Sequence, residues 1–357
     1  MSPLGEKLIS RIRAFGPMTV AEYMEACLAD PVYGYYMRRE PFGRYGDFVT
    51  APEVSQMFGE LIGVWAVVAW EAMGSPRDIV LAELGPGRGT LMADLLRVVR
   101  AMPGFTAAAE IHLVETSPRL RAIQEQTLAG CGSRIHWHQR IDTLPPGPLV
   151  AIANEFFDAL PIRQFRWGEE RWAERMVGLD AEGRLAFGLR PLDQRPLARP
   201  LPDGAIVETA PVASAVMATL AGRITATGGA ILAIDYGSDR PGYGDTLQAV
   251  KAHKYTDPLA EPGEADLTAH VDFAALARVA AEAGAKAHPL IGQGAFLNRL
   301  GIGPHADALG AGKDEATREQ VRAALERLTG PATMGELFKV LAVGAPGLLM
   351  PAFDGHS

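Results

Sequence analysis

A glycine-rich turn between an apolar run and a helical pattern constrains this chain more than any other feature. Residues 79–84 form a mainly apolar run, typical of a buried strand, and glycines follow at positions 85, 87 and 89. Apolar residues at helical spacing then continue to residue 99. A strand, a glycine turn and a helix in this order bring backbone N–H groups and a positive helix end close to a ligand. The stretch therefore predicts a nucleotide-type cofactor site at the top of a parallel sheet.

Strands and helices alternate through much of the remaining chain, which predicts an α/β fold with right-handed crossovers. Further strands are expected at residues 110–115, 134–138, 149–155, 229–237, 285–291 and 338–343. Helices are expected at residues 118–129, 212–225, 272–283 and 314–328. Near the start of the chain, Thr19 with Glu22 and Thr50 with Glu53 each fit a capping box that opens a helix.

Two stretches interrupt the alternation and predict insertions. Short runs separated by turn residues between positions 164 and 190 are typical of an antiparallel meander. The expected organisation begins with a helical N-terminal cap that includes a collar rich in glycine and tyrosine (1–76). An α/β domain follows in three parts (77–163, 206–237 and 271–345), separated by an antiparallel insertion (164–205) and a second insertion (238–270), and the chain ends in a tail (346–357).

Composition excludes several classes of protein. With 34 basic and 42 acidic residues, the net charge of −8 disfavours wholesale nucleic-acid binding. The two cysteines, Cys27 and Cys131, are too few and too widely spaced for a disulfide framework or a zinc cluster. The densest apolar run, at 62–70, is far shorter than the roughly 20 residues of a membrane span. We therefore expect no membrane insertion and no metal, and the lack of a secretory pattern in the first residues favours a cytoplasmic location.

Three classes of cofactor use a glycine turn of this kind. A phosphate-binding Walker loop requires a lysine after its last glycine, and this turn has none. A nicotinamide fingerprint requires Gly-x-Gly-x-x-Gly, whereas Thr90 stands where the third glycine would fall. The third class is S-adenosylmethionine, which has no pyrophosphate but carries a sulfonium, an amino group and a carboxylate. A site for it should contain acidic side chains as well as glycines.

Three carboxylates follow strands at positions that suit this cofactor. Glu83 can face its amino-acid end, Glu115 can accept both ribose hydroxyls, and Asp142 stands where the adenine amino group is expected. The alternatives are partly exposed strand ends for Glu83 and Glu115 and a turn residue for Asp142. The other residues expected to bind the cofactor are Gly85, Pro86, Gly87, Gly89, Thr90 and Asn154.

Residues 83–91 resemble the first motif of Rossmann-type S-adenosylmethionine-dependent methyltransferases. Three further stretches, 46–60, 154–161 and 257–273, resemble the MidA family of these enzymes, with Ala51 in place of the serine expected there. The resemblance implies a seven-stranded Rossmann-like sheet with a helical N-terminal region and inserted antiparallel strands. It also implies a protein arginine N-methyltransferase that uses S-adenosylmethionine, releases S-adenosylhomocysteine and acts on a protein substrate. A respiratory complex I subunit, dimethylated symmetrically to assist assembly, is the substrate that the family suggests.

An arginine acceptor requires carboxylates, because the guanidinium group stays protonated in water. Asn154, Glu155 and Asp158 follow the strand at 149–155, on the ligand edge of the sheet, and are the main catalytic candidates. The alternative is that Glu155 caps a helix and that the intervening phenylalanines belong to the core. Asp235 and His270 are further catalytic candidates. Residues expected to form a lid or to contact the substrate are Asp47, Glu53, Gln56 and Tyr236.

Two other functions remain as alternatives. The protein can be an assembly chaperone that binds S-adenosylmethionine for stability and acts by docking a partner. A nicotinamide-dependent dehydrogenase is disfavoured by Thr90. The sequence leaves open the acceptor residue, the degree and symmetry of methylation and the oligomeric state.

Overall fold

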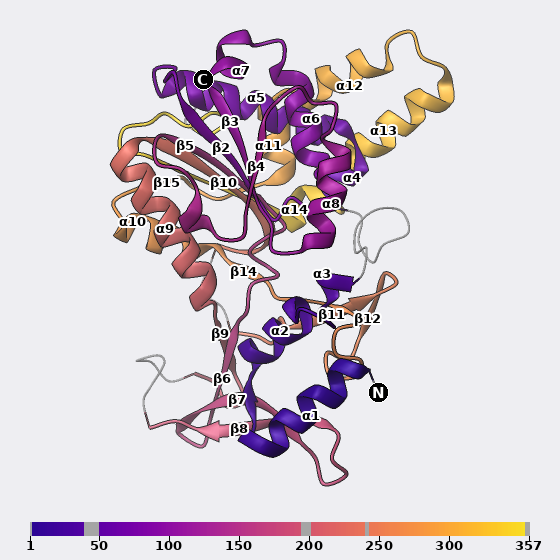
Figure 1. Ribbon diagram of the computed structural model, residues 1–357, viewed down its shortest axis with the longest axis vertical. Helices are drawn as coiled ribbons and strands as arrows, with labels where there is room; N and C mark the ends of the chain where they lie inside the picture. Colours follow the sequence, from indigo (N-terminus) through magenta and orange to yellow (C-terminus); the bar gives the residue numbers. More distant parts are fainter. Residues whose placement is uncertain (1, 39–49, 194–200, 240–242, 354–357) are drawn as a thin grey trace.

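A central sheet flanked by helices on both faces forms the upper part of the molecule in Figure 1. The computed structural model describes residues 2–38, 50–193, 201–239 and 243–353. Within these residues the sheet has the strand order β15-β17-β10-β5-β2-β3-β4, with β14 beside β10 and β16 beside β17. The parallel strands are β2 (Ile79–Leu84), β3 (Ala109–Val114), β4 (Ile135–His138), β5 (Leu149–Asn154), β10 (Gly229–Ser238) and β14 (Val271–Asp272). Thus the seven-stranded path expected of a Rossmann-like methyltransferase is present.

The antiparallel edge of this sheet differs from the expected one. β17 (Phe338–Gly344) runs antiparallel to β10, and the strand predicted at 285–291 is divided into β15 (Lys286–Ala287) and β16 (Ile291–Gly292). Pro289 lies between the two pieces. Because proline has no N–H to donate, it interrupts a ladder of strand hydrogen bonds. The predicted single strand at 285–291 is therefore wrong.

Helices cover the two faces of the sheet and divide the core between them. Every residue of β2 and of β5 is buried, as expected for parallel strands covered on both sides. Ile79 and Leu81 pack with α5 (Gln56–Ala72) and α6 (Thr90–Val99), whereas Val80 and Ala82 pack with α9 (Pro211–Thr227) and α10 (Phe273–Glu282). Because successive β2 side chains point to opposite faces of the sheet, this strand, which leads into the glycine turn, contributes to both hydrophobic clusters.

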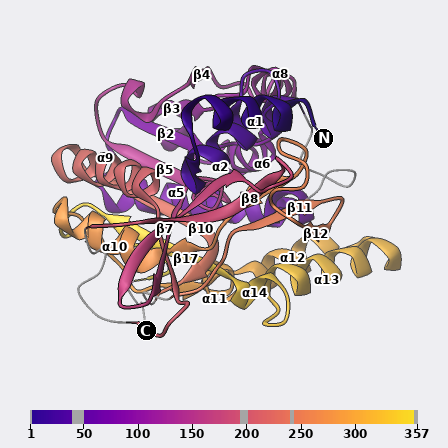
Figure 2. The same ribbon diagram turned by 90° about the horizontal axis from the view of Figure 1, so that it is seen from below.

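The lower lobe of the molecule in Figure 1, which faces the viewer in Figure 2, joins segments that are far apart in the sequence. One hydrophobic cluster contains residues of α1 (Pro3–Phe15), α2 (Val20–Ala29), β7 (Arg171–Leu179), β11 (Gln248–Lys251) and β13 (Asp266–Thr268). The Ser2 hydroxyl donates a hydrogen bond of 2.7 Å to the carbonyl of Pro262. The N-terminal helices and both insertions therefore share one core below the central sheet.

Two smaller sheets belong to this lobe. The first, among the described residues, has the order β1-β7-β6-β9, with β8 paired to β7, and the second has the order β12-β11-β13. The strands not yet given are β1 (Met18–Thr19), β6 (Arg163–Gly168), β8 (Leu185–Pro191), β9 (Ile206–Thr209) and β12 (Lys254–Thr256). The antiparallel sheet therefore draws β1 from the N-terminal region, which the meander in the sequence did not indicate.

The two predicted capping boxes have different outcomes. Thr19 and Glu22 form the box at the start of α2, as predicted. Thr50 makes no side-chain cap, and α4 (Ala51–Val54) ends after one turn; the Ser55 hydroxyl instead accepts from the N–H of Met57 and opens α5. The second box is therefore wrong, because the Glu53 carboxylate is bound elsewhere.

The remaining helices lie around the central sheet and at its C-terminal end. They are α3 (Tyr35–Arg38), α7 (Pro103–Ala108), α8 (Pro118–Thr127), α11 (Gln293–Arg299), α12 (Ile302–Gly310), α13 (Glu315–Thr329) and α14 (Met334–Leu337), together with the short 3₁₀ helix η1 (Ile141–Thr143). The pair α12 and α13 projects from the body of the molecule in Figure 1. None of the helices in the described ranges has the length and hydrophobicity needed to cross a membrane.

Candidate active site

The turn between β2 and α6 has a backbone that only glycine adopts readily. Gly85, Gly87 and Gly89 have φ values of 61°, 53° and 82°, in the left-handed region that disfavours residues with a side chain. A Cβ on Gly85 would also come within 3.0 Å of the Phe156 ring. Gly89 is the N-cap of α6, so the positive end of that helix meets the turn.

A small cavity opens beside this turn and is lined by acidic and amide side chains. Its lining includes Glu53, Glu83, Thr90, Asn154 and Glu155. Glu83 is only 3% exposed, and its Oε2 has no hydrogen-bond partner in the described part of the chain. Burial raises the pKa of Glu83 to about 8. The Oδ1 atom of Asn154 is likewise buried without a partner among those residues. Buried polar atoms are rarely left unsatisfied, so both point to a ligand.

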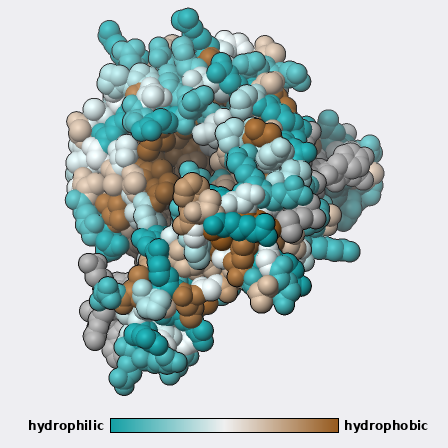
Figure 3. Space-filling model, turned by 60° about the horizontal axis from the view of Figure 1, so that its bottom comes forward, coloured by the Kyte–Doolittle hydropathy of each residue, from teal (hydrophilic) through white to brown (hydrophobic). Residues whose placement is uncertain are grey.

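A larger cavity of about 690 Å³ continues from the first and shares Gly85, Gly87 and Glu155 with it. Glu115 and Asp142 belong to its lining. Apolar side chains also line it, namely those of Val114, Leu120, Ile141, Leu160, Val212 and Val216. Figure 3 shows that the underside of the molecule is hollowed and that apolar side chains gather at the hollow. The two cavities together provide both polar and apolar contacts for a ligand.

Glu115 is oriented by hydrogen bonds that the sequence did not reveal. Its carboxylate accepts from the backbone N–H of Ser117 at 2.7 Å and from Gln124 Nε2 at 3.1 Å. Burial raises the pKa of Glu115, and these two donors oppose that effect. Gln124 also donates to the carbonyl of Gly87 at 2.8 Å and accepts from the indole of Trp137. Gln124 thus ties the glycine turn to Glu115, although no short motif marks it.

Asp142 lies at the rim of the larger cavity, in η1, and is exposed. The Arg140 guanidinium pairs with its carboxylate at 2.5 Å and lowers its pKa. The position of Asp142 agrees with a contact to the outer end of a ligand. Its ion pair with Arg140 leaves the Asp142 carboxylate less available to a ligand than those of Glu83 and Glu115.

The N-terminal collar reaches the site through Glu53. The Thr90 hydroxyl donates to Glu53 at 2.6 Å, and the N–H of Ala51 donates to Glu155 at 3.3 Å. The collar therefore contacts both the glycine turn and the loop after β5. Gln56 is exposed at the start of α5 and lines neither cavity. Asp47 lies outside the described residues.

Three carboxyl groups gather around the loop that follows β5: Asp158 and Asp235 are buried, and Glu155 is half-buried. Burial raises the pKa of Glu155 to about 8 and that of Asp158 to about 6. The pKa of Asp235 lies well above its usual value because of burial and of the two neighbouring carboxyls. No lysine or arginine of the described ranges pairs with any of the three, and Asp158 Oδ1 has no hydrogen-bond partner there. An uncompensated carboxyl cluster of this kind is suited to a cation.

Asp235 and Glu155 contribute to this cluster in different ways. The Asp235 carboxylate accepts from the N–H groups of Phe157 and Asp158, at 3.1 and 3.2 Å, and lines neither cavity. Glu155 has a φ of 50°, a strained value for a residue with a side chain, and lines both cavities. The geometry therefore gives Glu155 access to ligands and makes Asp235 a support of the loop.

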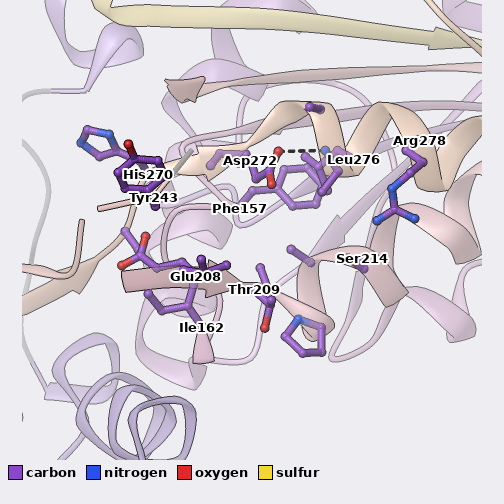
Figure 4. Close-up of a pocket in the computed structure, with 18 of the residues that line it drawn as sticks. Phe157, Ile162, Glu208, Thr209, Ser214, Tyr243, His270, Asp272, Leu276 and Arg278 are labelled. Carbon is purple, nitrogen blue, oxygen red and sulfur yellow. Dashed lines mark hydrogen bonds between the residues drawn. The ribbon is translucent and has the colours of Figure 1, made fainter. Parts of the chain in front are cut away.

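His270 is separated from the two cavities of the glycine turn. It lines another cavity, of about 900 Å³, together with Phe157, Glu208, Tyr243 and Asp272, and Figure 4 shows these side chains around it. None of the residues that line this third cavity lines either of the other two. Tyr236 connects the regions: its ring meets that of His270 edge-on at 5.4 Å, and its hydroxyl lies beside Asp158.

His136 and His138, which share a face of β4, are joined by His112 of β3. The His112 and His136 rings stack with 5.0 Å between their centroids, and His112 Nδ1 lies 2.9 Å from His138 Nε2. Within the described residues, no group of three or more His, Cys, Asp or Glu side chains is arranged to hold a metal ion. The contact is therefore a hydrogen bond between two imidazoles.

Comparison with known proteins identifies the family. A family of S-adenosyl-L-methionine-dependent methyltransferases matches residues 61–291, which include the glycine turn, the loop after β5 and the insertions. The chain belongs to this family. It is similar to a protein from Burkholderia thailandensis solved bound to S-adenosyl-homocysteine: 30% identity, 99% of this chain and 92% of that one covered, and a TM-score of 0.84.

Curated relatives are similar over most of their length. The zebrafish (Danio rerio) protein is 39% identical over 94% of this chain and 85% of its own, and the human protein is 37% identical over 96% and 83%. Both are named protein arginine methyltransferase NDUFAF7, mitochondrial. The methyltransferase class, its cofactor and the Rossmann-like fold predicted from the sequence are therefore confirmed.

The expected cytoplasmic location is wrong, because the curated relatives are mitochondrial proteins. The expectation rested on the lack of a secretory pattern, which argues against secretion but does not distinguish between compartments within the cell.

Proposed function

We propose that this methyltransferase transfers a methyl group from S-adenosylmethionine to an arginine side chain of a protein. The observation that carries the proposal is the cluster of Glu155, Asp158 and Asp235, which has no cationic partner in the described residues. Glu155 lines both cofactor cavities, whereas Asp158 and Asp235 are buried and line neither. A guanidinium group supplies the missing positive charge. The names of the curated relatives agree with this acceptor.

The cavities beside the glycine turn fit the cofactor by their chemistry. Glu83, buried with an unpartnered oxygen, would face the amino group, and the turn formed by Gly85, Pro86, Gly87, Gly89 and Thr90 would lie against the amino-acid end and the ribose. Glu115 would accept from the ribose hydroxyls, and Asp142 at the rim would meet the adenine amino group. When bound, the cofactor supplies a methyl group already activated by the sulfonium. The protein then has to orient the acceptor and exclude water.

Asn154, Glu155 and Asp158 would act on the acceptor. Charge-assisted hydrogen bonds from a guanidinium to Glu155 and Asp158 would fix the plane of the group and bring one nitrogen in line with the methyl group. As the new N–C bond forms and the C–S bond breaks, the acceptor becomes more acidic. A carboxylate with a pKa between about 6 and 8 is suited to receive its proton near neutral pH.

Asp235 would act through the loop, since its carboxylate holds the backbone of Phe157 and Asp158. We assign it a positioning role instead of the catalytic role expected from the sequence. His270 would contact the substrate away from the reacting atoms, because it lines a different cavity. Tyr236 would lie beside the acceptor, and Glu53 would lie beside the cofactor.

The family resemblance suggests which protein is the substrate. We propose a subunit of respiratory complex I, with symmetric dimethylarginine as the product. The experiment is mass spectrometry of arginine peptides from cells with and without this chain, combined with transfer of labelled methyl groups to a lysate of the deficient cells. Wild type should methylate arginine, whereas Gly87→Val, which blocks the glycine turn, should not. If wild type and Gly87→Val restored complex I assembly equally in the deficient cells, the alternative of a cofactor-binding scaffold would be supported instead.

A further inference from the structure

Tyr36 occupies a junction between three parts of the chain. It belongs to α3, in the N-terminal helices. Its carbonyl accepts from the Ser117 hydroxyl at 2.8 Å, which fixes it to the segment after β3. Its hydroxyl donates to the Asp266 carboxylate of β13, with distances of 2.9 and 3.2 Å to the two oxygens. The cofactor domain and the second insertion therefore both hold Tyr36 in place.

The Tyr36 side chain lies between the cofactor cavity and the acceptor carboxyls. It lines the cavity of about 690 Å³ together with Glu155 and Phe156. The pKa of its hydroxyl is raised by burial and then by the charges of Asp266 and Asp158, which places both carboxyls close to it. Asp158 is 6% exposed, and its Oδ1 has no partner within the described chain. Tyr36 thus lines the cavity together with Glu155, and the buried Asp158, which lines none of the three cavities, lies close to the Tyr36 hydroxyl.

We propose that Tyr36 contacts the acceptor and that its ring supplies an aromatic face for the arginine side chain. This inference rests on the proposed function. It adds Tyr36 as the residue through which the N-terminal helices contact the acceptor. A guanidinium is planar and weakly hydrated, so it can stack on an aromatic ring while its edge binds carboxylates. Glu155 and Asp158 would bind that edge, and the bond to Asp266 would keep the ring from turning away. A lysine has no comparable plane and would fit the site less well.

The third cavity offers a matched control. Tyr243 lines the cavity of about 900 Å³ with His270 and is 55% exposed (Figure 4). It is a tyrosine on a cavity wall, as Tyr36 is, but it lies away from the glycine turn. If any tyrosine on a cavity wall helped to bind peptides, substitutions at both positions would weaken peptide binding. If the contact is specific to an acceptor beside Glu155, only substitution of Tyr36 would weaken it.

The test measures peptide and cofactor binding separately in the full-length protein. The probes are the peptides Gly-Gly-Arg-Gly-Gly and Gly-Gly-Lys-Gly-Gly, each titrated into protein saturated with S-adenosylhomocysteine, and S-adenosylhomocysteine itself. For Tyr36→Leu, which keeps an apolar side chain without the aromatic face, the dissociation constant of the arginine peptide should rise about tenfold, the scale of a desolvated cation–π contact. Tyr36→Phe should restore it to within about twofold of wild type, and Tyr243→Ala should leave it unchanged. Cofactor affinity should stay within about twofold in all three variants, which also shows that they fold.

Three results would overturn the inference. Unchanged arginine-peptide binding in Tyr36→Leu would remove Tyr36 from the acceptor site. An equal loss of S-adenosylhomocysteine affinity would make it a cofactor residue, and a loss in Tyr243→Ala alone would move the acceptor to the third cavity. Failure of the proposed function looks different: wild type would then bind the arginine peptide no better than the lysine peptide.

Discussion

Glu83 should make the stability of the ligand-free protein fall as the pH rises. Burial raises the pKa of this carboxyl from 4.5 to about 8, and one pKa unit corresponds to about 1.4 kcal/mol. The folded state binds the proton more tightly than the unfolded state, so its contribution is fully present below pH 4.5 and is lost as the pH rises through about 8. The loss approaches about 5 kcal/mol as an upper bound, or about 1.4 kcal/mol for each pH unit between 5 and 8.

Urea unfolding of wild type and Glu83→Gln between pH 5 and pH 9 would measure this term. The glutamine does not titrate, so the difference in unfolding free energy should change by about 1.4 kcal/mol per pH unit in favour of the variant. Glu71→Gln, which changes an exposed carboxylate on α5, should follow wild type. Saturating S-adenosylhomocysteine should reduce the pH dependence of wild type, because its amino group offsets the charge of Glu83. Parallel curves for wild type and Glu83→Gln would refute both the raised pKa and the placement of this carboxyl beside a cationic ligand.

Three further substitutions separate the parts of the site. Glu115→Ala should weaken S-adenosylhomocysteine binding by roughly 1.5–3 kcal/mol in calorimetry, the scale of a hydrogen bond to a charged group; an unchanged dissociation constant would exclude a ribose contact. Asp158→Asn should keep cofactor affinity and lower the rate of methyl transfer, so parallel losses would reassign Asp158 to the cofactor. Gly85→Ala should weaken cofactor binding while circular dichroism stays native, because a φ of 61° disfavours a side chain and the new Cβ would displace Phe156, which lines the same cavity; normal binding would show that the turn adapts.

Local patterns correctly predicted the strand, the glycine turn and the helix of residues 79–99. The strand, the glycine turn and helix α6 are adjacent in the sequence, and their geometry depends on backbone rules that act over a few residues. The same rules failed at Thr50. Its spacing to Glu53 matches that of Thr19 to Glu22, but the Glu53 carboxylate accepts from Thr90, 37 residues away. A local rule holds only where no distant group competes for the same side chain.

Other contacts of the site, at its cofactor end as well as at its acceptor end, are contained in no local pattern. Gln124 is fully buried and Tyr36 bonds to Asp266, 230 residues further along the chain. Periodicity indicates which face of a helix is buried but not what it packs against. The interrupted alternation of strands and helices indicated an insertion at 238–270 but not what it packs against. The structure then shows that this insertion shares a core with the N-terminal helices.

The position of the carboxyl groups links stability to function in this fold. Glu83 and Glu155 both have a pKa near 8, so near neutral pH each is held protonated at a cost to folding that an apolar residue would not impose. Glu155 adds backbone strain at a φ of 50°. A cofactor amino group and an acceptor guanidinium would each relieve part of this cost by favouring the ionised carboxylate, and that relief is binding energy. Replacing these residues by neutral ones should therefore stabilise the empty protein and weaken its complexes, a pairing of effects that purely structural carboxyls would not produce.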